Sequence, residues 1–447
     1  MATTSSRNAL LHQDPNYSFP VLERGEGIYL YDEGGKRYID GTAGAGNVTL
    51  GHGRRRIAAA MAEQAESLGY CFSAHFSNRA AIELAERLAV LAPGALNHAY
   101  FVSGGSEGIE TALKLAFLYH LQRGNGQKQI VISRWRGYHG ATLGALAVTG
   151  TTARNPFANW LLPFPHIAPC YPYRCSFVGC EGKCNLSCAN ELEKAILQTG
   201  PENVAAFVAE PVVLGGIAIG VPPPDYFPRI REICDKYDVL FIADEVITGF
   251  GRTGKLFAIE HWDAVPDMIV FAKGISSGYI PLGGVLFQDE IRQVLNSADG
   301  GLPHVFTSVN HPVAMKVAST VLDIIEEEGI LENARDVGDY LLKRALELRK
   351  YPMVGDIRGK GLMLGMELVR DRETKQPFEA SLGVHKRIRR ILLEKGLSAG
   401  ASGGTADWKS GDDLRLHPPL VITREQVDEV IAIVDEGLAE LESELSE

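Results

Sequence analysis

The sequence predicts an α/β fold in which a large domain holds a mostly parallel, doubly wound sheet and a smaller α+β domain accompanies it. Strand and helix patterns alternate through residues 99–287, and this alternation is typical of a parallel sheet with helices on both faces. After about residue 325 the composition becomes rich in Leu, Ala, Glu and Lys. The chain of 447 residues is long enough for about two to three domains.

The large domain is predicted from short apolar runs that alternate with segments of helical spacing. The fully apolar run at residues 239–243 is typical of a strand that is buried on both faces. The other strands are expected at residues 99–102, 130–133, 204–209, 268–272 and 284–287, and helices at residues 106–121 and 226–236.

Both ends of the chain predict smaller units around this sheet. Residues 1–25 have little periodicity and are expected to form an arm, and residues 27–40 alternate around Gly34-Gly35 as a hairpin does. Helical spacing follows at residues 57–68 and 80–91. Towards the C-terminus we expect helices at 331–349, 384–395 and 423–441, strands at 354–358, 363–368 and 414–416, and a loop at 401–413.

These patterns divide the chain into three segments. Residues 1–70 are expected to contribute to the small domain, and residues 71–325 to form the large domain with a cysteine-rich insertion at 170–188. Residues 326–447 are expected to form the rest of the small domain.

The composition excludes several classes of partner. The formal net charge is −11, which argues against general binding to nucleic acid or to anionic membranes. The first residues lack the apolar core of a signal peptide, and Glu210, Pro211 and two glycines interrupt the longest apolar stretch, residues 205–221. We therefore expect no membrane partner and a cytoplasmic location.

Two short motifs point to other enzyme classes. Residues 104–108 fit G-x-S-x-G between a strand and a helix, which is the pattern of a serine hydrolase, but Gly and Ser at a helix N-terminus also suit a phosphate. Residues 249–254 fit G-x-G-x-x-G. Leu256 stands where a P-loop needs Ser or Thr, and no clear helix opens there, so we interpret this run as a structural loop.

Five of the seven cysteines crowd into the insertion with the spacing C-x4-C-x4-C-x3-C-x3-C. Structural zinc sites use paired C-x2-4-C segments, and these gaps lie at the long end of that range. A zinc or iron–sulfur site, a redox switch and a surface insertion with reduced thiols all stay open. The residues concerned are Cys170, Cys175, Cys180, Cys184 and Cys188.

A carboxylate and a lysine carry the main chemical signal. The buried run at residues 239–243 ends in Asp244, and the run at residues 268–272 ends in Lys273. The carboxyl ends of parallel strands converge on the ligand crevice of an open α/β sheet. A lysine that forms a Schiff base and a carboxylate that keeps a pyridine nitrogen protonated suit pyridoxal 5'-phosphate, and burial lowers the pKa of such a lysine.

Other residues complete a candidate cofactor pocket. Gly105 and Ser106 begin a helix and can hold a phosphate. Tyr138 follows the strand at 130–133 and could stack on a pyridine ring.

From about residue 27 to the last helix, the sequence resembles the class III, or omega, aminotransferases, which are pyridoxal-phosphate enzymes of fold type I. The resemblance rests on several segments taken together. They are residues 101–107 with Glu110, Tyr138-His139-Gly140, 209–212, 244–254, Lys273-Gly274, 281–284, His311-Pro312 and 415–419.

The resemblance implies a role for each matching residue. Lys273 would be the Schiff-base lysine and proton shuttle, and Asp244 would bind the pyridine nitrogen. Tyr138 and Val246 would lie on the two faces of the ring. Gly105, Ser106 and, from a neighbouring subunit, Thr307 would bind the phosphate, so a homodimer or higher homo-oligomer is implied. The complete predicted cofactor set is Gly105, Ser106, Tyr138, His139, Asp244, Val246, Lys273 and Thr307.

Two further matches concern the substrate. Arg415 matches the arginine that binds a substrate carboxylate, and Glu210 matches the glutamate that pairs with this arginine when the amino donor lacks an α-carboxylate. A guanidinium can clamp a carboxylate with two hydrogen bonds or be neutralised by the glutamate. A permanent structural salt bridge is the alternative.

The resemblance implies transfer of an amino group from an amine or amino acid to a 2-keto acid, with pyruvate or 2-oxoglutarate as the acceptor. The alternative is an amino-acid racemase or epimerase of the same family, which uses the same lysine. Residues 306–312 depart from the family pattern F-T-Y-S-G-H-P. The lost aromatic and glycine reshape the wall on the phosphate side of the partner's pocket, and therefore bear on substrate preference.

Overall fold

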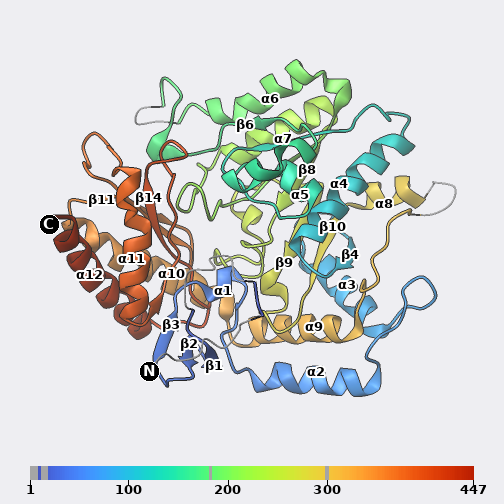
Figure 1. Cartoon of the computed structure of the whole chain (residues 1–447). Helices are drawn as coiled ribbons and strands as arrows, with labels where there is room; N and C mark the ends of the chain where they lie inside the picture. The colour runs from blue at the N-terminus through green and yellow to red at the C-terminus, as the bar shows by residue number, and fades with distance from the viewer. Residues whose placement is uncertain (1–8, 12–18, 181–183, 297–301, 447) are drawn as a thin grey trace.

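The computed structural model describes residues 9–11, 19–180, 184–296 and 302–446 (Figure 1). Its largest sheet has seven strands in the order β4-β10-β9-β8-β7-β5-β6. These strands are β4 (His98–Val102), β5 (Ile130–Arg134), β6 (His166–Ile167), β7 (Val204–Ala209), β8 (Leu240–Asp244), β9 (Met268–Ala272) and β10 (Gly283–Phe287).

The large sheet is mostly parallel, which confirms the predicted fold class. Strands β6, β5, β7, β8 and β9 pair in parallel, whereas β10 is antiparallel to both of its neighbours. Every residue of β7, β8 and β9 is buried. This burial explains why these strands read as continuous apolar runs rather than alternating ones.

Helices cover the sheet and position its functional edge. The helix α4 (Gly105–Gln122) packs against β10 and β9, α7 (Tyr226–Tyr237) packs against β8 and α6 (Ser187–Thr199), and α3 (Arg79–Leu91) packs against β4. Shorter helices are α1 (Ala43–Gly46), α5 (Leu143–Val148) and α8 (Asp289–Asn296). The N-terminus of α4 and the carboxyl ends of β8 and β9 therefore belong to neighbouring elements.

The N-terminal strands pair with a C-terminal one. The predicted hairpin is present as β2 (Tyr29–Asp32) and β3 (Arg37–Asp40), and β3 pairs in parallel with β13 (Leu397–Ser398). A further strand, β1 (Leu22–Glu26), begins inside the segment expected to be an arm; much of that arm lies outside the described residues. The helix α2 (Arg55–Ser67) instead packs against α9 (Pro312–Glu327). The domain boundaries stay a prediction.

The C-terminal part has its own three-stranded antiparallel sheet. Its order is β11-β12-β14, with β11 (Val354–Gly359), β12 (Leu364–Leu368) and β14 (Asp412–Leu416). The helices α10 (Ile330–Leu346), α11 (Val384–Glu394) and α12 (Arg424–Ser446) complete this region, and α12 packs against the other two. The loop predicted at residues 401–413 is two residues shorter in the structure, because β14 already starts at Asp412.

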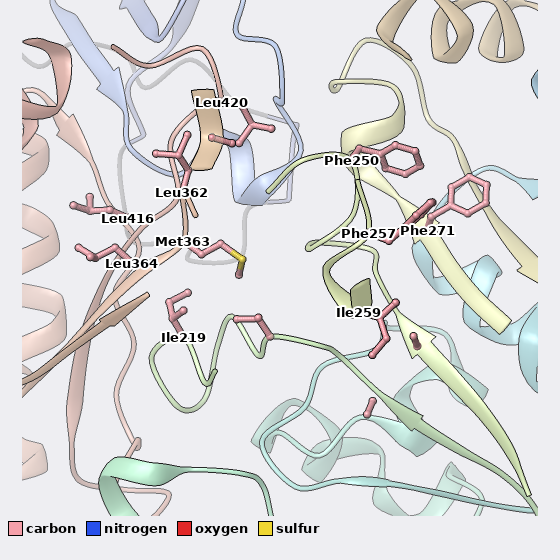
Figure 2. Close-up of a cluster of buried hydrophobic side chains, with 14 of the residues drawn as sticks. Ile219, Phe250, Phe257, Ile259, Phe271, Leu362, Met363, Leu364, Leu416 and Leu420 are labelled. Carbon is pink, nitrogen blue, oxygen red and sulfur yellow. The ribbon is translucent and has the colours of Figure 1, made fainter. Parts of the chain in front are cut away.

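The two regions share one continuous apolar core. Figure 2 shows Phe250, Phe257 and Phe271 beside the large sheet, and Leu364 and Leu416 on the strands of the C-terminal sheet. Ile219, which belongs to the same buried cluster, lies between the two groups. This packing fixes the C-terminal strands relative to the ends of β8 and β9.

Two long helices were not predicted from the sequence. Most of α9 is buried, and its buried residues Val313, Val317 and Val321 recur at helical spacing, so this helix was missed although its pattern is present in the sequence. The helix α6 begins at Ser187, directly before the last residue of the cysteine run. The closely spaced cysteines were interpreted as one cluster, and the helix that begins among them was therefore not predicted.

Candidate active site

A cavity of about 210 Å³ opens at the carboxyl ends of β8 and β9, next to the N-terminus of α4. It brings together every site residue predicted from the sequence except Thr307 and Arg415. The lining residues are Gly105, Ser106, Tyr138, His139, Gly140, Glu210, Val212, Asp244, Val246, Ile247, Thr248 and Lys273.

Asp244 is the last residue of β8 and its side chain is buried. Its Oδ1 accepts a hydrogen bond from the backbone N–H of Val246 at 3.0 Å. Its Oδ2 lies 2.7 Å from Nδ1 of His139. These two contacts hold the carboxylate in one orientation at the edge of the cavity.

His139 is completely enclosed and supports this carboxylate. Because an ionised carboxylate can only accept, Nδ1 of His139 donates to Asp244. The backbone N–H of His139 donates to Oγ1 of Thr149 at 2.9 Å. Burial opposes protonation of the ring, but the carboxylates of Glu210 and Asp244 outweigh it and raise the pKa of His139. The imidazole is therefore held as a donor towards Asp244.

Lys273 directly follows β9 and lines the same cavity. Burial lowers the pKa of its ammonium group to about 8, although the nearby Asp244 acts in the opposite direction. The φ angle of Lys273 is +48°, a left-handed conformation that is uncommon for a residue other than glycine and is found at functional sites. Its Nζ donates to the backbone carbonyl of Ala45 at 3.0 Å. The amine is thus placed in the cavity and close to its neutral, nucleophilic form.

The first turn of α4 also lines the cavity, through Gly105 and Ser106. Such a turn presents backbone N–H groups that favour an anion. A Cβ atom at Gly105 would lie 2.9 Å from Cγ1 of Val246, so a larger residue does not fit there. Oγ of Ser106 accepts from the N–H of Ala141 at 3.1 Å. Gly140 has a φ of +137°, and a Cβ there would meet Ser106 at 2.5 Å.

Glu210 fixes the segment that carries Tyr138. Its Oε1 accepts from the backbone N–H of Tyr138 at 2.9 Å. Its Oε2 lies 3.3 Å from Nη2 of Arg134 and 3.6 Å from Nε2 of His139. The ring of Tyr138 is left about half exposed, at 48%. In this structure Glu210 is therefore engaged by Arg134.

Arg134 was missed by the sequence analysis. It is the last residue of β5, is completely buried, and donates from Nη2 to the backbone carbonyl of Glu210 as well as to its carboxylate. The sequence did contain a signal for Arg134, because this residue directly follows the strand predicted at residues 130–133. A charged side chain that is buried at the end of a strand needs a partner.

Arg415 lies on β14, outside the cavity lining. Its Nε forms an ion pair with Oδ1 of Asp413 at 3.1 Å, and its Nη2 donates to Oγ of Ser402 at 3.3 Å. A Cβ atom placed on Gly215 would lie 3.3 Å from its Nη1. The pairing of Arg415 with Glu210 stays a prediction about a substrate-bound state.

Thr307 also lies away from the cavity of its own chain. Its backbone carbonyl accepts a hydrogen bond from the hydroxyl of Tyr70 at 2.8 Å. Its expected contact with the phosphate across a subunit interface stays a prediction.

Residues 249–254 do not line the candidate cavity and make packing contacts instead, in line with their interpretation as a structural loop. The guanidinium of Arg252 is buried and donates to the backbone carbonyl of His417 at 3.2 Å. Gly254 packs against Arg335 of α10. The run therefore connects the two sheets, and the short helical turn at Ala258–His261 follows it.

Among the described residues no group of three or more His, Cys, Asp or Glu side chains is placed to hold a metal ion. Part of the cysteine run, residues 181–183, lies outside these residues. No described helix is long and apolar enough to cross a membrane.

Comparisons with known proteins identify the class. The class III aminotransferase family matches residues 12–438. The chain is 39% identical over 417 residues to a putrescine–pyruvate aminotransferase from Pseudomonas aeruginosa, which covers 92% of this chain and 89% of the relative. It is 38% identical over 426 residues to a diaminobutyrate–2-oxoglutarate transaminase from Halomonas elongata, with 92% and 88% covered.

A solved structure agrees with these relatives. The thermostable (S)-enantioselective omega-transaminase from Thermomicrobium roseum superposes with a TM-score of 0.89 at 40% identity, over 96% of both chains. The fold is therefore that of the fold type I transaminases. The chain belongs to the class III aminotransferase family. It is an enzyme that moves an amino group between an amine and a keto acid.

Proposed function

We propose that the chain binds pyridoxal 5'-phosphate in the 210 Å³ cavity and transfers an amino group from an amine or amino acid to a 2-keto acid. The observation that carries this proposal is the placement of Lys273 and Asp244. They lie at the ends of the neighbouring parallel strands β9 and β8 and line one cavity.

The residues present fit the cofactor. The first turn of α4 suits the phosphate because its backbone N–H groups favour an anion. Gly105 lies so close to Val246 that it has no room for a side chain, and it therefore offers only its backbone to the phosphate. Val246 and Tyr138 line the cavity and are assigned to the two faces of the pyridine ring. Asp244 is assigned to the ring nitrogen, because a buried carboxylate stabilises a proton there.

When bound, pyridoxal phosphate supplies a carbonyl that takes up the amino group and a ring that accepts electrons. The protein supplies the rest. His139 orients Asp244 through the 2.7 Å contact, and a hydrogen bond donated to a carboxylate favours its ionised form. Lys273, with its pKa lowered to about 8 by burial, holds or releases a proton at Nζ near neutral pH.

For the substrates, we propose that Arg415 binds a carboxylate and that Glu210 neutralises Arg415 when the donor has none. Because a carboxylate offers about four acceptor sites on its two oxygens, pairing with Arg415 does not by itself require Glu210 to leave Arg134. Pyruvate and 2-oxoglutarate are the proposed acceptors. The names of the two relatives above, which include these acceptors, support this choice.

We further propose that the active unit is a homodimer or a higher oligomer. Thr307 lies outside the cavity of its own chain, which supports its assignment to the phosphate of a neighbouring subunit. The mass of the purified enzyme in solution, measured by light scattering, tests this part directly.

A donor–acceptor screen tests the reaction. Purified enzyme with added cofactor should form alanine or glutamate from pyruvate or 2-oxoglutarate only when an amine or amino-acid donor is present. Inversion of a single amino acid without any keto acid would instead establish the racemase alternative. Lys273→Ala should abolish the visible absorbance of covalently attached cofactor, and persistence of this band would overturn the assignment of Lys273.

A further inference from the structure

A second cavity, with a volume of about 490 Å³, lies where the segment after β5, the start of the cysteine-rich insertion and the loop before β14 meet. It shares no lining residue with the cofactor cavity. Its volume is in the range of cavities that hold small organic ligands. The lining side chains that bear on its chemistry are Trp135, Arg136, Tyr171, Arg174, Phe177 and Trp408.

The lining of this cavity carries positive charge only. Of the described residues, two arginines and no Asp or Glu line it. Nε of Arg174 donates to the buried carboxylate of Glu367, so the charge of Arg174 is already neutralised. Arg136 therefore supplies the excess positive charge of the cavity.

Arg136 is 8% exposed, yet no carboxylate of the described residues forms an ion pair with it. Its Nη1 donates to the backbone carbonyls of Gly404 at 2.5 Å and Gly216 at 3.4 Å. Its guanidinium carbon lies 3.7 Å from the centre of the Trp408 ring. Nε and Nη2 form no hydrogen bond within the described part of the chain. These two atoms share one edge of the guanidinium, the edge that can donate two parallel hydrogen bonds to a carboxylate.

The charge of Arg136 is not compensated by its surroundings. Burial lowers the pKa of Arg136, although the carboxylates of Asp407 and Glu367 act in the opposite direction. Asp407 is exposed and accepts from the backbone N–H groups of Lys409 at 2.9 Å and Ser410 at 2.6 Å. A buried cation without a carboxylate partner favours an anionic ligand.

Aromatic side chains form much of the remaining wall. Trp135 stacks on His166, with the ring centres 4.5 Å apart and the planes at 24°. Trp408 meets Trp135 edge-on at 6.0 Å. The two tryptophans are still 37% and 42% exposed, so both rings offer apolar surface to a ligand. An anion on a flat or apolar body fits such walls.

The cavity lies next to the residue that is proposed to bind the substrate carboxylate. Arg136 donates to one carbonyl in each of two loops, residues 215–216 and residues 402–404. Arg415 lies against the first of these loops through Nη1 and donates from Nη2 to Oγ of Ser402 in the second at 3.3 Å. The two guanidinium groups therefore contact the same pair of loops.

We propose that this cavity binds a small molecule in which a carboxylate is attached to a flat or apolar body, with the carboxylate on Nε and Nη2 of Arg136 and the body against Trp135 and Trp408. The carboxylate belongs to the far end of a long substrate or to a separate carboxylic acid, two sources that share one recognition chemistry. The first source rests on the proposed function, and the second does not.

Calorimetric titration of the holoenzyme with 4-phenylbutyrate tests the site without any assay of activity. We expect the wild type to bind this acid about tenfold or more tightly than the neutral 4-phenylbutyramide, because the amide lacks the charge. Arg136→Gln should remove this preference. The control Arg154→Gln should retain it, because Arg154 lies 5.6 Å from the Trp135 ring but does not line the cavity.

Two results of this titration would overturn the proposal. One is equal affinity of the wild type for the acid and the amide, which needs no variant and so does not depend on whether Arg136→Gln folds. The other is a preference for the acid that Arg136→Gln retains and Arg415→Ala loses, because the acid would then occupy the neighbouring arginine.

Keto acids of equal length distinguish the two sources of the carboxylate. The acceptors 2-oxoadipate and 2-oxohexanoate differ only in the carboxylate at the far end. If a substrate reaches the cavity, the ratio of their kcat/KM values should fall about tenfold or more in Arg136→Gln and stay constant in Arg154→Gln. A constant ratio in both variants, together with the expected calorimetry, assigns the site to a separate carboxylic acid. An enzyme that aminates no keto acid contradicts the proposed function and leaves the calorimetric result in place.

Discussion

His139 and Asp244 form a buried pair at the edge of the candidate cofactor cavity, with Nδ1 of the histidine 2.7 Å from Oδ2 of the aspartate. The two residues come from different elements, since Asp244 ends β8 whereas His139 follows β5. Both strands belong to the large parallel sheet and have only β7 between them. The sheet order therefore creates this contact.

Loss of the histidine donor should weaken cofactor binding. His139→Leu removes a hydrogen bond to a carboxylate, which contributes about 1.5–3 kcal/mol, so we expect the Kd for pyridoxal phosphate to rise about tenfold or more. His139→Asn keeps an N–H donor and should restore part of the affinity. Titration of the cofactor-free enzyme by absorbance measures both values. Equal effects of the two variants would contradict a role through Asp244.

Cofactor attachment should depend on pH with a midpoint near the lowered pKa of Lys273. Only the neutral amine is nucleophilic. With a pKa of about 8, about one lysine in ten is neutral at pH 7, compared with about one in three thousand at the ordinary value. The rate at which the cofactor-free enzyme takes up pyridoxal phosphate should rise from pH 6.5 through a midpoint near pH 8 and level off above about pH 9. A rate that keeps rising beyond pH 10 would show an unperturbed lysine.

The first turn of α4 offers a matched pair of glycine variants. Gly105→Ala places a Cβ atom 2.9 Å from Val246, so the turn must shift, and we expect cofactor affinity to fall about tenfold or more. Gly104→Ala is the control, because its Cβ would have no atom within 4 Å and its backbone is extended. Both affinities are measured by absorbance titration. A larger loss in Gly104→Ala would contradict the phosphate assignment.

The sequence alone was enough to predict that Asp244 and Lys273 lie close together at the centre of the candidate site. The strands β8 and β9 are buried on both faces, so they appear as apolar runs, and Asp244 and Lys273 stand out as the charged residues that directly end them. The carboxyl ends of parallel strands share one edge of the sheet. Adjacent placement of these two residues followed from that rule.

The side-chain contacts that hold these two residues in place could not be predicted from the sequence in the same way. Arg134, the last residue of β5, meets Glu210 after β7, and His139 meets Asp244 at the end of β8. Such contacts depend on side-chain packing between segments, for which the local pattern carries no period. The helix α9 is a different case, because its buried residues Val313, Val317 and Val321 recur at helical spacing and could have been recognised.

Arg415 should affect only substrates that carry the carboxylate it binds. Arg415→Ala removes a charge-assisted hydrogen bond of about 1.5–3 kcal/mol, so KM for the keto acid should rise about tenfold or more. KM for a donor amine without a carboxylate should stay unchanged. Arg415→Lys keeps the charge that faces Asp413 and separates this effect from lost stability. Equal increases in both KM values would indicate a structural salt bridge instead.

Glu245, the residue after the candidate cofactor-binding aspartate, should make thermal stability depend on pH. Its side chain is fully enclosed, where its carboxyl group accepts from the N–H of Ile259 at 2.8 Å. Burial raises its pKa from 4.5 to about 7, so the folded chain keeps a proton that the unfolded chain has released. Between these values stability falls as pH rises, by about 3 kcal/mol in total, and the loss levels off above about pH 7. Glu245→Gln can keep the hydrogen bond but cannot ionise. Its Tm relative to wild type should therefore increase from pH 5 to pH 8, whereas the exposed control Glu232→Gln should give a constant difference. A constant difference for Glu245→Gln as well would mean that Glu245 is ionised in the folded enzyme throughout this range.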